Sequence, residues 1–209
     1  MKKEYILFLS SLLLSIHGFG QQYPNLISIS TATARIYEPG LSGYARHSFV
    51  AMPMVSYKRM VHKHYFTQLS FAAWRPAPSH SPKNLLVYQI GNMQNAVGKV
   101  IERGKFYYVD IAIGANVLDK NHHLLAVNLA PSLTWGKSEF LTDYYAGSGE
   151  VTMWTEVKNT SYFGALLNAS YAYSLLEGRF KVGVYGTARY YPNRQMKQVD
   201  LGVHVGFSF

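Results

Sequence analysis

The last twelve residues of the chain, Gln198 to Phe209, constrain the fold more than any other segment. Because successive side chains of a β-strand point to opposite faces, strict alternation gives a strand one apolar face and one small or polar face. Six apolar residues alternate here with five small or polar ones, which are Val199, Leu201, Val203, Val205, Phe207 and Phe209 against Asp200, Gly202, His204, Gly206 and Ser208. The segment therefore predicts a strand between an apolar and a polar environment.

Similar alternation recurs along the chain in segments of about ten residues that turn residues separate. We expect the first strand to switch faces near Ser30 through a bulge, and Pro53 predicts a bulge in the second because proline lacks a ladder donor. The predicted strands before the closing one cover Leu26 to Tyr37, Ser48 to Met60, His64 to Arg75, Phe106 to Val117, Leu125 to Trp135, Tyr162 to Leu175 and Arg179 to Tyr191.

The connections between these strands differ in length in a regular way. Short turns are predicted over Val61 to Lys63, Asp119 to His122 and Leu176 to Gly178. Long loops are predicted over Glu38 to His47, Arg75 to Lys105, Gly136 to Ser161 and Pro192 to Lys197. Short turns on one side and long loops on the other are typical of transmembrane β-barrels.

The strand count has one alternative. Leu85 to Glu102 has apolar residues at helical spacing, yet Val97 to Phe106 also reads as strand, turn and strand. A ten-stranded version would recruit Leu85 to Ile101 and part of Gly136 to Tyr145. We expect eight strands, an even number that leaves both chain ends on the same side.

The face opposite the apolar one distinguishes a membrane barrel from a soluble sheet protein. It is rich in Gly, Ala, Ser, Thr and Asn, which fits the narrow lumen of eight strands better than the core of a sandwich or lipocalin-like barrel. The chain is also 15% aromatic, with 17 Tyr, as suits membrane interfaces. The prediction is an all-β, eight-stranded antiparallel up-and-down transmembrane β-barrel with interface aromatics at Tyr37, Tyr57, Trp74, Tyr107, Trp135 and Tyr190.

The alternating closing strand and its terminal phenylalanine resemble those of bacterial outer-membrane β-barrel proteins, with Phe207 and Phe209 as the carboxyl-terminal barrel signal. The chain is similar to small barrels of the OmpA and OmpX type and their Bacteroidetes relatives. This resemblance implies the Gram-negative outer membrane as location, and folding with help from the barrel assembly machinery.

The amino terminus resembles a cleaved signal peptide. Lys2 and Lys3 precede a short apolar run, Ile6 to Ile16, and small residues follow before Gln21 and Gln22. The run is shorter than the roughly 20 residues of a transmembrane helix. The expected division is a signal peptide at 1–22 and a barrel domain at 23–209.

Composition limits the partners and the chemistry. The formal charge is +9, but Lys and Arg are scattered and no nucleic-acid motif accompanies them, so outer-membrane lipid and lipopolysaccharide phosphates are the expected partners. The chain has no Cys, which excludes disulfides, thiol catalysis and cysteine zinc sites.

Motifs for catalysis are absent from the sequence, so we predict no enzyme, cofactor or metal site. His62, His64, His80, His122 and His123 are interpreted as solvated turn and loop residues. Lipid A deacylases place His and Ser two residues apart on a strand facing lipid. Here His204 is predicted to point inward and is followed two residues later by Gly206, so that pattern fails.

Charged residues on the inward face define the candidate site. In a narrow lumen they should pair or hydrogen-bond, because unpaired buried charge is costly. The expected result is a polar plug, and the alternative is a constricted, weakly anion-selective pathway. The predicted lumen network comprises Lys58, Asp110, Lys181, Arg189, Asp200 and His204, with Arg35 as a further inward residue.

The predicted function is structural or surface interaction through the extracellular loops, above all the aromatic Gly136 to Ser161 loop. A narrow porin-like channel is the first alternative and a lipid-modifying outer-membrane enzyme the second. No feature of the sequence identifies the extracellular partner.

Overall fold

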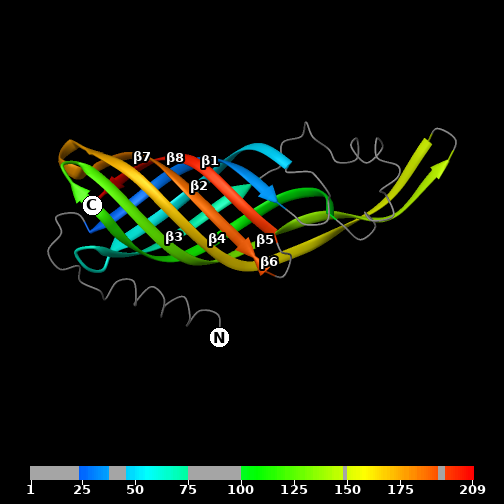
Figure 1. Ribbon diagram of the computed structural model, residues 1–209, viewed down its shortest axis with the longest axis horizontal. Helices are drawn as coiled ribbons and strands as arrows, with labels where there is room; N and C mark the ends of the chain where they lie inside the picture. Colours follow the sequence, from blue (N-terminus) through cyan, green and yellow to red (C-terminus); the bar gives the residue numbers. More distant parts are fainter. Residues whose placement is uncertain (1–23, 38–45, 75–99, 148–149, 193–195) are drawn as a thin grey trace.

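The computed structural model shows a closed barrel of eight antiparallel strands in chain order (Figure 1). The structure describes residues 24–37, 46–74, 100–147, 150–192 and 196–209. The strands are β1 Asn25–Tyr37, β2 Arg46–Met60, β3 Tyr65–Trp74, β4 Val100–Lys120, β5 His123–Gly147, β6 Glu150–Leu175, β7 Phe180–Tyr191 and β8 Met196–Ser208. The eight-stranded, up-and-down prediction is confirmed.

The barrel closes between the first and the last strand. β8 pairs with β1 from Leu26 opposite Ser208 to Tyr37 opposite Lys197. The Asn25 amide donates to the Phe209 carbonyl oxygen at 3.0 Å, and the Phe209 amide donates to the Asn25 oxygen at 2.9 Å. Closure removes the sheet edges, so the backbone groups of these strands are paired within the barrel.

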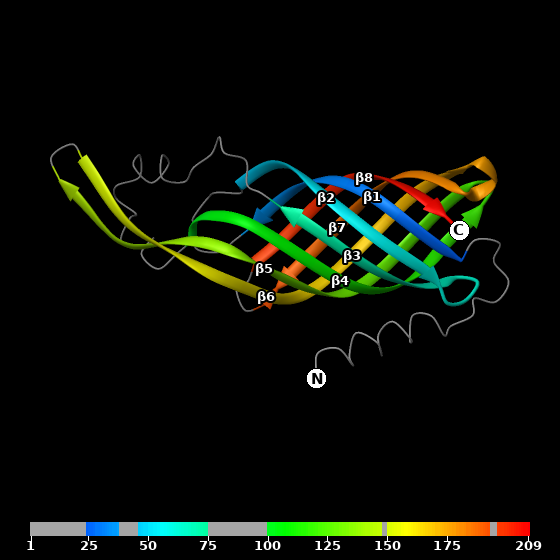
Figure 2. The same ribbon diagram turned by 180° about the vertical axis from the view of Figure 1, so that it is seen from behind.

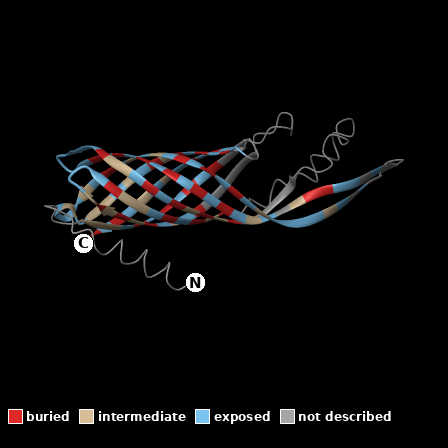
Figure 3. Cartoon of the chain, turned by 90° about the horizontal axis from the view of Figure 1, so that it is seen from below, coloured by how far each residue is buried: buried red, intermediate tan, exposed pale blue. Residues whose placement is uncertain are grey.

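Side chains alternate between the lumen and the outside along each strand, which gives the striped burial pattern of Figure 3. Large apolar side chains cover the outside; the most exposed include Ile29, Ile113, Val117, Phe163 and Leu201, at 62–68%. Small residues such as Ser28, Ala112 and Ser132 are buried on the inside. The two faces of β8 are arranged as its alternation predicts.

The three short turns lie where the sequence places them, at the barrel end that also holds Asn25 and Phe209 (Figures 1 and 2). Lys120 pairs with His123, so Asn121 and His122 form a two-residue hairpin loop with φ of 52° and 70°. Two positive φ values define the type I′ turn, whose twist matches that of the flanking strands. The segment Leu176–Gly178 forms a tight turn between β6 and β7, with positive φ at all three residues.

Two predictions for the first hairpin, a face switch near Ser30 and a bulge in the strand of Pro53, have different outcomes. β1 keeps one alternation from Ser28 to Ala34, so the face switch expected near Ser30 does not occur. The irregularity lies in β2, where Ala32 pairs with Met52 but Ala34 pairs with Ser48. Because the one residue of β1 between these pairs, Thr33, faces the three residues 49–51 of β2, the extra residues bulge from the strand that carries the proline, just before Pro53, as predicted.

The prediction of a loop over Gly136 to Ser161 is wrong. These residues extend β5 and β6 into a long hairpin, paired from Gly136 with Thr160 to Gly147 with Glu150 (Figures 1 and 2). β4 accompanies β5 as far as Phe140, and from Leu141 on, among the described residues, β5 pairs with β6 alone. Seven further residues of strand span roughly 20–25 Å. Beyond Leu141, which is buried, most of the described side chains of the hairpin are exposed, so little burial imposes alternation on this segment.

Several predictions fall outside the described residues: the signal peptide, most of the loop Glu38 to His47, and the ambiguous segment Leu85 to Glu102 apart from its last three residues. Those three, from Val100, begin β4. In the described part of the chain, no helix has the length and apolar character to cross a membrane.

Candidate functional site: the barrel lumen

All six predicted lumen residues lie on the inward face, but the structure divides them into two groups. Lys181 and Arg189 mark the two levels, because their positions on β7 differ by eight residues, roughly 25 Å of strand. Arg189 lies at the hairpin end of the lumen with Asp110 and Asp200. Lys181 lies at the end that holds Asn25 and Phe209, called the termini end below, on the level of Lys58 and His204.

The first group is an ion cluster, defined here as Asp110, Arg189 and Asp200. Arg189 Nη2 donates to Asp110 Oδ2 at 2.9 Å, and Nη1 donates to Asp200 Oδ2. The three side chains are at most 5% exposed. One guanidinium therefore serves two carboxylates, which leaves the cluster with a formal charge of −1.

Neutral side chains extend the ion cluster. Gln198 Nε2 donates to Asp200 Oδ1 at 2.7 Å, and Tyr108 Oη donates to Gln198 Oε1 at 3.1 Å. The Arg189 guanidinium carbon also lies 5.1 Å from the centre of the Tyr108 ring. These contacts supply hydrogen bonds that a buried carboxylate requires. Gln198 and Tyr108 were not predicted, although their parity with Asp200 and Asp110 places them inside.

The cluster crosses the lumen. In the strand order of the closed barrel, β4 lies diametrically opposite β8. Asp110 and Tyr108 come from β4, Arg189 from β7, and Gln198 and Asp200 from β8. The hydrogen-bonded chain therefore connects opposite walls, which occupies the lumen at this level with side chains.

Aromatic rings pack around the ion cluster on the hairpin side. Phe106 lies 5.9 Å from Trp74 and 6.2 Å from Tyr162, and Tyr162 lies 6.1 Å from Tyr191, between ring centres. All four are buried, with Met52 and Tyr108 in the same hydrophobic cluster. Tyr191 Oη shares a 2.7 Å hydrogen bond with Thr134 Oγ1. The lumen is therefore partly apolar, which the small and polar lumen expected from the sequence did not include.

Trp74 was assigned to the membrane interface, and that assignment is wrong. Its side chain is 2% exposed and contacts Phe106 inside the barrel. Parity along β3 gives the reason: Trp74 follows Ser70 and Ala72 on the inward face, whereas Leu69 and Phe71 point outward. The prediction relied on the position of Trp74 near a strand end, but the face of the strand decides whether a side chain meets lipid or the lumen.

Inward glycines make room for these rings. Phe106 pairs with Gly136, Tyr185 with Gly202, and Phe66 with Gly114 across neighbouring strands. A Cβ added at Gly202 would lie 2.7 Å from the Tyr185 ring, and one at Gly114 would lie 2.4 Å from Phe66 Cζ. A large ring over a glycine fills the space that a missing side chain leaves, which lets an eight-stranded lumen hold aromatics.

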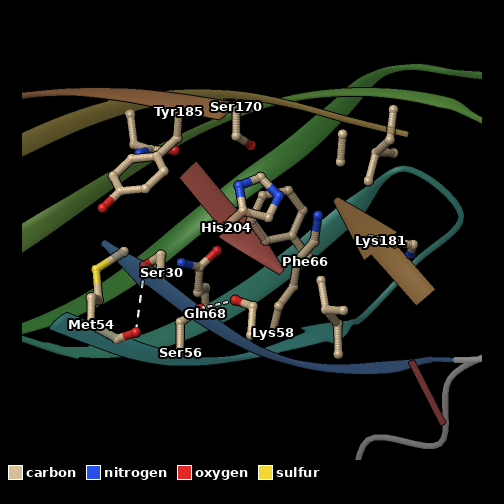
Figure 4. A pocket seen from close by; sticks show the side chains of 15 residues that line it. Ser30, Met54, Ser56, Lys58, Phe66, Gln68, Ser170, Lys181, Tyr185 and His204 are labelled. Atoms are coloured by element: carbon tan, nitrogen blue, oxygen red, sulfur yellow. Dashed lines mark hydrogen bonds between the residues drawn. The ribbon is translucent and has the colours of Figure 1, made fainter. Parts of the chain in front are cut away.

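The second group surrounds a small cavity toward the termini end (Figure 4). Lys58 Nζ donates to Asn116 Oδ1 at 2.9 Å and lies 3.6 Å from the centre of the Phe66 ring. The His204 ring lies 6.2 Å from that of Tyr185. No carboxylate of the described residues forms an ion pair with Lys58 or Lys181, so Lys181 is not part of the ion cluster.

The outer aromatics gather at both ends of the barrel wall. Trp135 stacks on Tyr107 at 5.8 Å, with Phe71 6.0 Å from Tyr107, and Tyr190 is exposed on the same half. Tyr57 lies at the other end and donates to Asn25 Oδ1 at 2.8 Å. The side chain of Tyr37 is outside the described residues. Three exposed tyrosines of the termini half were not among the predicted interface aromatics: Tyr65, Tyr171 and Tyr173.

The turn histidines form aromatic contacts. His123 Nδ1 and Tyr171 Oη are 2.6 Å apart, and the His123 ring meets the Tyr173 ring at 5.2 Å. In the described ranges no group of three or more His, Cys, Asp or Glu side chains is placed to hold a metal ion.

Comparison with known proteins identifies the fold. No family model matches the chain, and no curated protein matches it. Among solved structures, Ail, the attachment invasion locus protein of Yersinia pestis, has a TM-score of 0.57 and 15% identity over 90% of this chain and 100% of Ail. Neisserial surface protein A has a TM-score of 0.58 and 10% identity over 88% of this chain and 97% of its own.

The amino-terminal β-barrel domain of Pseudomonas aeruginosa OprF is also similar, with a TM-score of 0.53 and 12% identity over 90% of this chain and 100% of that domain. Identities this low establish architecture only. The closed eight-stranded topology, the apolar outside and the side-chain-filled lumen agree with it. The chain therefore has the fold of the small eight-stranded β-barrels of bacterial outer membranes.

Proposed function

We propose that the protein is an integral barrel of a Gram-negative outer membrane that serves a structural or surface-interaction role through its β5–β6 hairpin. The continuous cover of exposed apolar side chains supports the membrane location, because an apolar surface of this extent marks a contact with lipid or another partner. The short-turn end with both termini is assigned to the periplasm. The hairpin then projects outward from the cell.

The hairpin carries this proposal. Three of its large apolar side chains are exposed, Tyr145 at 63%, Trp154 at 51% and Val157 at 63%. Tyr and Trp dominate the binding energy of many protein interfaces. Because both strands continue from the barrel wall, the backbone is ordered before any partner arrives, which lowers the entropy that binding costs.

The same proposal includes a lumen that does not conduct. The ion cluster connects opposite walls, and Trp74, Phe106 and Tyr162 pack beside it. Single-channel conductance tests this directly. Steps in a planar bilayer would favour the narrow porin-like channel instead, and their absence supports the plug.

Lipopolysaccharide is the proposed lipid partner on the hairpin half. Lys105, Lys137 and Lys197 are exposed there, and Lys105 Nζ lies 4.8 Å from the centre of the Tyr107 ring. Lysines beside an aromatic belt suit phosphate groups at headgroup depth. Export by a cleaved signal peptide and insertion by the barrel assembly machinery complete the proposal.

A shortened hairpin tests the surface role. Phe140 and Glu156 are paired, so an Asn-Gly turn joining them replaces residues 141–155 with a two-residue hairpin loop. Cells that display the full-length protein should adhere to glycan- or matrix-coated surfaces, and cells with the shortened protein should not. The double variant Tyr145→Ser and Trp154→Ser is the matched control, because it keeps the hairpin and removes two aromatic contacts.

Heat-modifiability shows whether each variant is folded. Each variant should migrate faster unboiled than boiled, as a folded barrel does. Equal adherence of full-length and shortened proteins, with both folded, would contradict a role for the hairpin. Lipid A of unchanged mass on expression would agree with the proposal that the protein is not a lipid-modifying enzyme.

A further inference from the structure

The cavity near the termini end of the lumen has an unusual charge balance. Two lysines and one histidine line it, Lys58, Lys181 and His204, and no carboxylate does. Asp119 interacts electrostatically with both lysines from the exposed end of β4, outside the lining. The ion cluster farther along the lumen has the opposite balance, with two carboxylates for one guanidinium. The two levels of the lumen are therefore separated in sign.

Lys58 is the most confined charge of the cavity. It is 8% exposed, and among the described residues Nζ has one hydrogen-bond acceptor, Asn116 Oδ1. An ammonium group has three donors, so two remain without a partner. The Phe66 ring 3.6 Å away favours a cation, but it supplies no negative charge. Buried charge of this kind calls for a counter-charge.

Neutral donors surround the same space. The Tyr185 hydroxyl is buried close to the Ser30 hydroxyl, and both residues line the cavity. Ser28 and Ser56 contribute hydroxyls that are 2.6 Å apart, and either is able to donate outward. Figure 4 shows the His204 ring between Tyr185 and the Lys58 side chain, with the Tyr185 hydroxyl turned away from Lys58 toward the side of Ser30 and with Lys181 standing to one side.

The size of the cavity selects the ligand. Its volume is about 50 Å³. One water needs roughly 10–15 Å³ on this measure, so the space holds roughly three to five water-sized groups. A small tetrahedral oxyanion has that number of non-hydrogen atoms and fits this space. The ion cluster occupies the lumen beyond, so a ligand enters from the end where the chain terminates.

We propose that this cavity is a binding site for a small oxyanion of the phosphate class, held by Lys58 with His204 and the serine hydroxyls and attracted by Lys181. The site is blind rather than part of a pathway. It is independent of the hairpin, so a failure of the surface role leaves it untouched.

The test is titration of the refolded protein with inorganic phosphate in a maltoside detergent, which carries no phosphate of its own. Phosphorus NMR line broadening should saturate for the wild type. Lys58→Gln should weaken binding about tenfold or more, because a charge-assisted bond and the buried counter-charge are lost together. Lys158→Gln is the matched control, since Lys158 is exposed and pairs with Glu156 on the hairpin.

A second variant keeps the proposal falsifiable if Lys58→Gln folds poorly. Ser56→Ala removes one hydroxyl of the lining, and should weaken phosphate binding a few-fold with an unchanged mobility shift. Dihexanoyl phosphatidylglycerol as competitor separates two sources of the same chemistry: displacement of phosphate indicates a lipid headgroup, and none indicates a free anion. Absence of saturable binding to the wild type, or equal binding by Lys58→Gln, overturns the proposal.

Discussion

Removing the guanidinium of the ion cluster should destabilise the barrel more than removing either carboxylate. Arg189→Met leaves Asp110 and Asp200 facing one another without a cation, at side-chain exposures of 5% and 0%. Breaking a buried pair from one side costs about 3–5 kcal/mol. With a urea dependence of about 1–3 kcal/mol per molar, the unfolding midpoint should fall by about 1–5 M.

The two carboxylate variants should destabilise the barrel less than Arg189→Met, in a definite order. Asp110→Asn leaves Arg189 paired with Asp200 and brings the cluster to neutrality, so it should cost less than Arg189→Met. Asp200→Asn should fall between them, because Asp200 accepts from both Arg189 and Gln198. The triple variant Arg189→Met, Asp110→Asn and Asp200→Asn removes all charge and should recover most of the loss.

The assay is urea unfolding in lipid vesicles, followed by tryptophan fluorescence and by the mobility shift. Lys158→Met is the control for loss of an exposed pair, since the 2.8 Å contact with Glu156 is solvated and is worth about 0–1 kcal/mol. The reasoning is refuted if Arg189→Met costs no more than Lys158→Met. It is also refuted if the triple variant is as unstable as the single one.

Three further predictions follow from particular positions. Gly202→Ala should lower the free energy of unfolding by about 1–3 kcal/mol, because the added Cβ clashes with the Tyr185 ring and the Thr31 carbonyl oxygen. Gly186→Ala, whose nearest contact is Leu201 at 3.3 Å, should be close to neutral, and equal urea midpoints of the two variants would contradict this. In single-tryptophan variants, brominated lipid should quench Trp135 and aqueous acrylamide should quench Trp154, while neither reaches Trp74; lipid quenching of Trp74 would place it outside the barrel. His122→Gly should stabilise the protein by up to about 1 kcal/mol, because a φ of 70° costs a residue with a Cβ about 1–2 kcal/mol and glycine loses about 0.5–1 kcal/mol more entropy on folding; a lower midpoint would count against this reasoning.

The sequence determined the barrel because alternation is a local property. Each inward or outward position follows from parity once a strand is recognised, so the eight strands, the three short turns and the inward face of Asp110, Arg189 and Asp200 were all accessible. The same parity places Trp74 inside, so that error was one of interpretation. The length of β5 and β6 was not accessible, because beyond Phe140, among the described residues, β5 pairs with β6 alone and most side chains are exposed, so little burial imposes alternation.

The tertiary structure alone decided which inward residues meet. Parity gives the face of a side chain, but its level along the barrel and the wall it faces depend on strand register and closure. Arg189 meets Asp110 from β4 as well as its neighbour Asp200, whereas Lys181 on the same strand stays eight positions away beside Lys58. The sequence therefore determined a barrel with a charged lumen, and the register of the closed sheet separated that charge into a carboxylate-rich cluster and a basic cavity.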